Sequence, residues 1–220
     1  MGDSEDSTKP PRFPVGALKR PRYQAGHYLA ASDLATWQRY RLQRLRRHDR
    51  YLHGWGVVCG LRVVPAAETG RPWAVRVCPG YAIGPYGDEI EVATQVVIDL
   101  REHLWLQPLA DADKLKTAFL GLRYAEQMRR SIPANVPSCG CAETGDKASR
   151  IRDGFRLDVL WRPKLPDELE SFDLCAQTSA PCPDCPDSPY ILLACIKLPD
   201  SESQSINGDD IDNWTYRKQL

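Results

Sequence analysis

Residues 51–63, YLHGWGVVCGLRV, lie at the point where the repeat of apolar residues along the chain changes. Before this stretch the apolar residues recur at helical spacing among arginines, and after Gly56 they alternate with a period of two, as in a β-strand. The two glycines allow backbone conformations that other residues resist, and the indole between them can cover the end of a sheet. We therefore interpret Gly54, Trp55 and Gly56 as a structural hinge between a helix and a β-domain.

The segment before the hinge, residues 32–54, has the features of one α-helix. Ser32 can serve as its N-cap, Asp33 suits the first turn, and Gly54 suits the C-terminal exit. A narrow apolar stripe runs along this predicted helix and consists of Leu34, Trp37, Leu45 and Leu52.

Arginines occupy most of the remaining surface of this helix: Arg39, Arg41, Arg44, Arg46, Arg47 and Arg50. Arginine is the preferred cation of protein interfaces, because its planar guanidinium pairs with carboxylates and stacks on rings, so we take these six residues as candidates for partner binding. Two alternatives stay open. The arginines can form a solvated or internally paired face, or they can contact the phosphates of a nucleic acid while Trp37, Tyr40 and Tyr51 stack on bases.

Composition limits the classes of partner. Lys plus Arg and Asp plus Glu each number 29, so no overall charge attracts the chain to nucleic acid or to an anionic membrane. The N-terminal region lacks the apolar core of a signal peptide, and no stretch approaches the roughly 18 continuous apolar residues of a membrane helix. We expect a soluble, cytoplasmic protein with no membrane insertion, and we do not expect nucleic acid as its main partner.

Short alternating segments after the hinge predict β-strands joined by tight turns, with Gly84-Pro85-Tyr86-Gly87 as one such turn. The chain also carries 18 prolines and 15 glycines, which favour a turn-rich fold over a helical bundle. The predicted fold class is mainly β (α+β): an N-terminal arm and one arginine-rich helix, followed by an antiparallel sheet or small barrel with cysteine-rich irregular loops.

Three regions follow from this pattern. Residues 1–26 are polar and proline-rich and are predicted to form an extended arm. Residues 27–110 are predicted to hold the helix and a first β-domain, and residues 111–220 a second β-rich region with the cysteine-rich loops.

Four of the eight cysteines form two closely spaced pairs about 40 residues apart: Cys139, Cys141, Cys182 and Cys185. Four thiolates at tetrahedral geometry suit a structural zinc ion, and such an ion would replace a missing apolar core in these polar loops. We therefore expect a four-cysteine zinc site, with Cys175 as a substitute for any member. Disulfides or free thiols remain open.

The cysteines within alternating apolar segments have a different expected role. Cys59, Cys78 and Cys195 are predicted to pack in the core, because free cysteine is among the most buried residue types.

Nothing in the sequence has the spacing of a familiar catalytic motif. The four histidines are scattered, and we interpret His53 as a partner for the carbonyls at the end of the helix. A hydrolase that uses Asp88, Glu89 or Glu91 is a third reading, but alternation puts Glu89 and Glu91 on the polar face of an edge strand. We expect that the protein is not an enzyme.

Several segments together resemble a bacterial family that occurs with contractile injection systems, which are phage-tail-like particles. The similarity covers roughly residues 27–216, and its most specific parts are LHGWGVVCGL and PGYAIGPYGDEI. The other matching segments are VRVC, FLGLRYAEQ, ASRIRDGFRLDVL, PYILLACIKL and IDNWTYR.

The resemblance implies a structural subunit, similar to baseplate or tail-fibre attachment proteins, that binds other subunits as a homo-oligomer or hetero-assembly. It implies a place at the baseplate, spike or fibre-attachment end of the particle, and it supplies no catalytic residues. The alternative is a zinc-stabilised nucleic-acid-binding module that uses the arginine-rich helix.

Overall fold

The computed structural model describes residues 18–66, 70–104, 117–132, 147–160, 187–199, 201 and 203–220. The chain divides into two compact units, Met1–Arg47 and His48–Leu220. The boundary predicted after residue 110 lies outside the described residues, and both predicted boundaries stay predictions. No helix in the described ranges combines the length and the apolar character needed to cross a bilayer.

Helix α1 spans Ala31–His48, so the predicted helix is confirmed. Its predicted N-cap is wrong, because Ser32 lies inside the first turn and its carbonyl accepts a hydrogen bond from the hydroxyl of Thr36 at 2.7 Å. The helix begins one residue earlier, where the carboxylate of Asp33 accepts a hydrogen bond from the amide of Ala30 at 3.1 Å. This backward contact satisfies one of the amides that every helix start leaves without a partner.

The helix does not end as a regular α-helix. It is followed by a π-helical turn, Asp49–His53, in which the amide of Gly54 donates to the carbonyl of Asp49 at 3.0 Å. Gly54 then leaves the turn with a φ of 81°, a conformation that glycine adopts without the strain of a Cβ. The exit at Gly54 is as predicted, but apolar spacing did not indicate the π turn.

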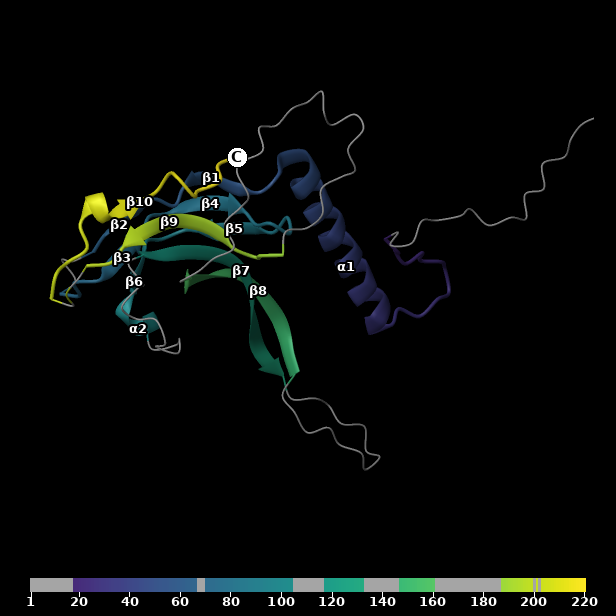
Figure 1. Ribbon diagram of the computed structural model, residues 1–220. Helices are drawn as coiled ribbons and strands as arrows, with labels where there is room; N and C mark the ends of the chain where they lie inside the picture. The colour runs from purple at the N-terminus through teal and green to yellow at the C-terminus, as the bar shows by residue number, and fades with distance from the viewer. Residues whose placement is uncertain are drawn as a thin grey trace, which may run out of the picture. The chain divides into compact units, whose positions relative to one another are not determined.

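Ten strands form three antiparallel sheets in the described residues, which confirms the mainly β class and gives open sheets rather than a barrel (Figure 1). The first sheet has the order β1-β4-β5, with β1 at Gly56–Gly60, β4 at Gly80–Ile83 and β5 at Glu89–Val92. The second has the order β2-β3-β6, with β2 at Val63–Pro65, β3 at Ala74–Val77 and β6 at Val96–Asp99. Helix α2, Arg101–Leu104, follows β6.

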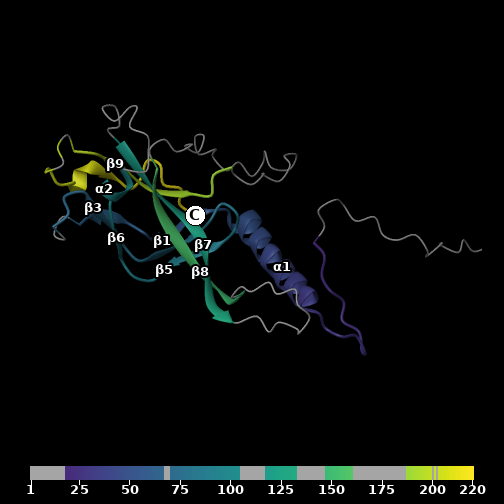
Figure 2. The same ribbon diagram turned by 90° about the horizontal axis from the view of Figure 1, so that it is seen from below.

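The third sheet has the order β10-β9-β7-β8 and contains the longest strands. They are β7 at Thr117–Ile132, β8 at Lys147–Leu160, β9 at Ile191–Lys197 and β10 at Ile211–Asp212. Strand β9 pairs with β7 only along 117–122, so the far part of β7 and β8 runs on as a two-stranded ribbon (Figures 1 and 2).

All three sheets contribute to one apolar core. Its fully buried members include Val57 of β1, Val75 of β3, Leu120 of β7 and Leu193 of β9. Burial of each such side chain contributes about 1.5–3 kcal/mol relative to exposure, so this shared core is what holds the sheets of the second unit together.

The alternation predicted for 57–63 fails at one residue. The pairing of β1 with β4 shifts register between Val57 and Cys59, and Leu61 has a φ of 55°. The bulge turns Cys59 to the exposed face, and the positive φ of Leu61 turns the chain again. As a result Val57, Leu61 and Val63 are buried while Cys59 is exposed. The predicted core position of Cys59 is therefore wrong.

The other two cysteines predicted to lie in the core are not fully buried. Cys78 and Cys195 are both half-buried free thiols. Burial raises the pKa of the Cys195 thiol, with a smaller contribution from Asp212.

Two glycines face each other where β1 and β4 meet. Gly60 pairs with Gly80, and a Cβ on Gly80 would overlap the carbonyl oxygen of Cys59 and the amide nitrogen of Leu61. Because these obstacles are backbone atoms, no side-chain rotation can relieve the overlap.

We expect Gly80→Ala to lower the free energy of unfolding by about 1–3 kcal/mol, the usual cost of forcing atoms into a packed site. Urea denaturation followed by circular dichroism would measure it. Gly208→Ala is the matched control, because nothing lies within 4 Å of a Cβ at that position. Equal stability of the two variants would contradict the close approach.

Candidate partner-binding site

Helix α1 has no buried residue in its 18 residues. Its apolar side chains Leu34, Trp37 and Leu45 are between 46% and 54% exposed. They lie at positions i, i+3 and i+11, which share one face of a helix, and Arg41 at i+7 lies on the same face. The guanidinium of Arg41 stacks over the ring of Trp37, 5.6 Å from its centroid. We call Leu34, Trp37, Arg41 and Leu45 the α1 stripe.

The arginines predicted for partner binding are spread over the same helix and its π turn. Within the described residues, Arg39, Arg41 and Arg44 form no ion pair, so no carboxylate neutralises their charge there. The guanidinium of Arg44 instead donates to the hydroxyl of Tyr40, at 3.3 Å. Among the described residues, these three arginines therefore do not form an internally paired face.

Trp55 of the predicted hinge lies half-buried against the core of the second unit. The ammonium of Lys218 stacks over its ring at 4.2 Å from the centroid, and burial lowers the pKa of that ammonium. Gly56 has a φ of 149°, and a Cβ there would lie only 3.2 Å from the carbonyl carbon of Lys218. A side chain at residue 56 would thus push the C-terminal segment away from the hinge.

The C-terminal segment 211–220 is hydrogen-bonded to the residues that follow the hinge. The amide of Val57 donates to the carbonyl of Lys218 at 2.8 Å, and the amide of Leu220 donates to the carbonyl of Val57 at 3.0 Å. These two bonds continue the sheet with a short parallel bridge beside β1.

Two buried polar side chains of this segment complete the contact. The side-chain amide of Asn213 accepts from the amide of Val63 at 2.8 Å and donates to its carbonyl at 3.0 Å. The guanidinium of Arg217 donates to the carbonyls of Leu61, at 3.1 Å, and of Gly60. Burial lowers the pKa of Arg217, and the two backbone carbonyls offset part of that cost. Neither side chain was singled out from the sequence, although both lie in the segment IDNWTYR.

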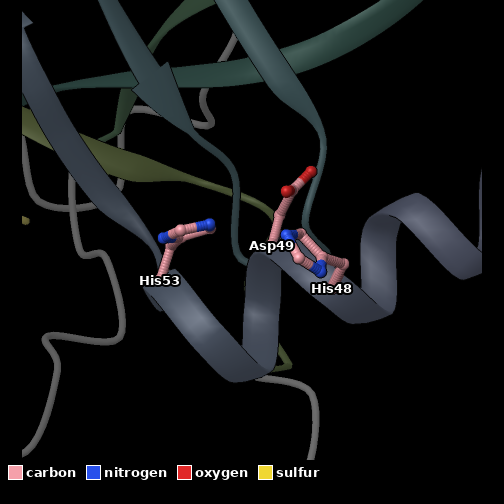
Figure 3. A group of neighbouring side chains, drawn as sticks. All are labelled: His48, Asp49 and His53. Carbon is pink, nitrogen blue, oxygen red and sulfur yellow. The ribbon is translucent and has the colours of Figure 1, made fainter.

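The π turn brings together three side chains that no sequence motif indicated as a group: His48, Asp49 and His53 (Figure 3). One potential ligand atom from each lies within 4.8 Å of the others, and the imidazole rings meet edge to face with centroids 5.4 Å apart. Burial raises the pKa of Asp49, the charge of Glu89 raises it further, and the two histidines act in the opposite direction. In the sequence, only the spacing of the two histidines at the end of the predicted helix could have indicated that these side chains lie together.

The acids considered for a hydrolase are distributed along β5 and the turn before it. Glu89 and Glu91 are exposed on the polar face of β5, and Asp88 is buried. Burial, together with a hydrogen bond and charge from Glu89, raises the pKa of Tyr81 to about 12. The exposed positions of the two glutamates agree with the expected alternation.

The two-stranded ribbon of β7 and β8 carries a basic pair of residues on one face and an apolar pair on the other. Arg129 and Arg150 are directly opposite each other, both exposed, and like charges in that arrangement are unfavourable. On the other face, Met128 and Ile151 form an exposed cross-strand pair, 66% and 50% exposed. We call these four residues the ribbon patch.

The predicted zinc ligands lie outside the described residues. These are Cys139, Cys141, Cys182 and Cys185, together with the substitute Cys175. The four-cysteine site stays a prediction.

Comparisons with known proteins give likenesses to solved structures, two of which are described below. No family model matches the chain, and no curated protein matches it. A solved structure described as "Crystal structure of TssK" is 13% identical with a TM-score of 0.44, covering 89% of this chain and 41% of that one. A chain of the TssK-TssF-TssG baseplate subcomplex of a type VI secretion system is 11% identical with a TM-score of 0.42, covering 82% of this chain and 57% of that one.

The chain spans less than two thirds of the length of either of these proteins. At TM-scores below 0.5, such a likeness does not indicate what a chain does. The candidate surfaces therefore have to be interpreted from their own residues.

We expect Asn213→Ala to lower the free energy of unfolding by about 1–3 kcal/mol, because it leaves the buried amide and carbonyl of Val63 without partners. Gln219→Ala removes an exposed amide from the same segment and should change stability by less than about 0.5 kcal/mol. Chemical denaturation of both variants tests this, and a loss below about 0.5 kcal/mol for Asn213→Ala would argue against the contact.

Proposed function

We propose that this protein is a non-enzymatic structural subunit of a contractile injection particle, at its baseplate, spike or fibre-attachment end. It assembles in the cytoplasm with other subunits of the particle, as a homo-oligomer or a hetero-assembly. The observation that carries the proposal is that helix α1 buries none of its 18 residues. The sequence resembles a protein family that occurs with such particles, and this resemblance indicates that the partners are other subunits of the particle.

An isolated helix of this length is only marginally stable in water, since tertiary packing of an apolar face provides most helix stability in proteins. The α1 stripe is an apolar face of the kind that docks in the groove of a partner. Trp and Arg are the residues most often found at the energetic centre of interfaces, and both occur in this stripe. A partner groove with an apolar floor and acidic rims would match it.

The ribbon patch supports the same proposal with a second surface. Its opposed Arg129 and Arg150 repel each other in the free protein, and a carboxylate placed between them would remove that repulsion. Met128 and Ile151 give the reverse face an apolar area that a partner can cover.

Trp37→Ala tests the role of the α1 stripe. We expect this variant to reduce incorporation into purified particles by about tenfold or more, since loss of an interface tryptophan commonly costs over about 1.4 kcal/mol. The measurement is the amount of the protein per particle after co-expression with the other particle genes.

Trp214→Ala is the matched control, because this tryptophan is also exposed, at 73%, but lies in the C-terminal segment. It should incorporate as the unaltered protein does. If Trp37→Ala incorporates equally well while its circular dichroism is unchanged, docking through α1 is excluded.

A nucleic-acid-binding module is the second candidate, and it is favoured by the absence of ion pairs at Arg39, Arg41 and Arg44 in the described residues. Binding of DNA or RNA would then weaken steeply with salt, because each phosphate contact releases counterions. A titration at about 50 mM and 200 mM salt separates the candidates: tight binding that falls about 10³-fold would favour nucleic acid.

We further propose that Cys139, Cys141, Cys182 and Cys185 hold one structural zinc ion that orders their polar loops. Cys139→Ser should lower the zinc content of the purified chain by one equivalent, as measured by elemental analysis. Cys59→Ser is the matched control, because that thiol is free and exposed on β1, and it should leave the zinc content unchanged. Zinc that is absent, or retained in Cys139→Ser, would contradict this ligand set.

A further inference from the structure

We propose that His48, Asp49 and His53 form a binding site for a divalent transition-metal ion of the zinc type. This proposal uses none of the residues of the predicted cysteine site, and it does not depend on the proposed function. It rests on three observations at the π turn: the convergence of three ligand types, a buried carboxylate oxygen without a partner, and the absence of a competing cation on that carboxylate among the described residues.

The π turn is what makes the three side chains converge. In an α-helix each residue turns by about 100°, so residues five apart point about 140° away from each other. The turn Asp49–His53 is closed by the hydrogen bond from the amide of Gly54 to the carbonyl of Asp49. A π turn holds one residue more than an α-helical turn, and this extra residue rotates His53 back toward His48. Figure 3 shows all three side chains leaving the same side of this turn.

Asp49 is the residue that requires a partner. It is only 6% exposed, and its Oδ2 atom has no hydrogen-bond partner among the described residues. A buried charged oxygen without a donor or a cation is costly, typically by more than a neutral group in the same position. The nearby carboxylate of Glu89 adds further negative charge to the site.

Cationic side chains nearby do not supply the missing charge. Across the described residues no guanidinium or ammonium forms an ion pair with Asp49. The guanidinium of Arg50, the next residue, stacks over the ring of Tyr51 at 4.4 Å and donates to its hydroxyl. A metal ion would therefore meet a carboxylate that is flanked by two imidazoles and not by a guanidinium.

Two histidines and one carboxylate are a ligand set that zinc and other first-row divalent metals accept. The ligand atoms can be up to 4.8 Å apart, which is wider than a bound ion requires, so the two exposed histidine rings would move inward on binding. An imidazole binds a metal ion through a ring nitrogen that carries no proton. Three protein ligands leave at least one position for water or for a side chain of another subunit.

The competing explanation is a proton. A protonated His48 or His53 could donate to Asp49 and neutralise it without any metal. The two explanations make opposite predictions for Asp49→Asn, which removes the buried charge and keeps the shape of the side chain. If a metal is the natural partner, the metal-free protein gains stability from this change, because an uncompensated charge disappears. If a protonated histidine is the partner, the same change removes an ion pair and lowers stability.

The test uses the full chain, stripped of metal and titrated with zinc alone by calorimetry at about pH 7.5. We expect His48→Gln to lose one equivalent of bound zinc, or to bind it about 100-fold more weakly. Mutation of a residue that only hydrogen-bonds to a metal ligand already lowers metal affinity by about 10–100-fold. His27→Gln changes an exposed histidine outside the turn and should keep the full zinc content.

Cobalt(II) substitution separates this site from the cysteine site. Thiolate ligands give intense charge-transfer absorption in the near ultraviolet, which His48→Gln should leave intact while the visible bands of one cobalt ion disappear. Asp49→Asn should lose the same ion and show a higher melting temperature than the unaltered metal-free chain. Unchanged zinc content in His48→Gln, or a lower melting temperature in metal-free Asp49→Asn, would overturn the proposal.

Discussion

The hydrogen bonds between the C-terminal segment and the residues after the hinge are the constraint on which the β-domain depends. β1 and β2 are short strands in two different sheets, and the residues between them turn sharply at Leu61, which has a positive φ. Asn213 and Arg217 supply the hydrogen bonds that the backbone at 60–63 would otherwise lack. Because these groups are buried and water cannot replace them, the corner between the two sheets is stable only while the segment is in place.

This arrangement also explains why the glycines of this region are needed. Gly60 and Gly80 let two backbones approach more closely than a Cβ permits, and Gly56 gives room to the carbonyl of Lys218. The C-terminal segment, β1 and β4 thus pack through their main chains as well as through apolar side chains. In this part of the molecule the local backbone conformation and the long-range contacts therefore depend on each other, so a substitution that alters one also alters the other.

Much of the fold could be predicted from the sequence, because it follows from local periodicity. The helix, its exit at Gly54 and the mainly β class depend on residues that are neighbours in the chain. The exposed position of Cys59 could not be predicted, since it results from a register shift between β1 and β4 that the alternation of residues does not indicate. The π turn that unites His48, Asp49 and His53, and the contacts of Asn213 and Arg217, depend on pairings that single-sequence patterns do not encode.

The dependence of 60–63 on 213–217 has a consequence for biosynthesis. The two sets of residues are about 150 positions apart, so the ribosome has to add the whole intervening chain before the corner can close. At about 5–20 residues per second this takes roughly 8–30 s, during which the nascent β1 edge lacks its final neighbour. The corner between β1 and β2 is thus completed late, and the early β-strands lack these hydrogen-bond partners until residues 213–217 have been added.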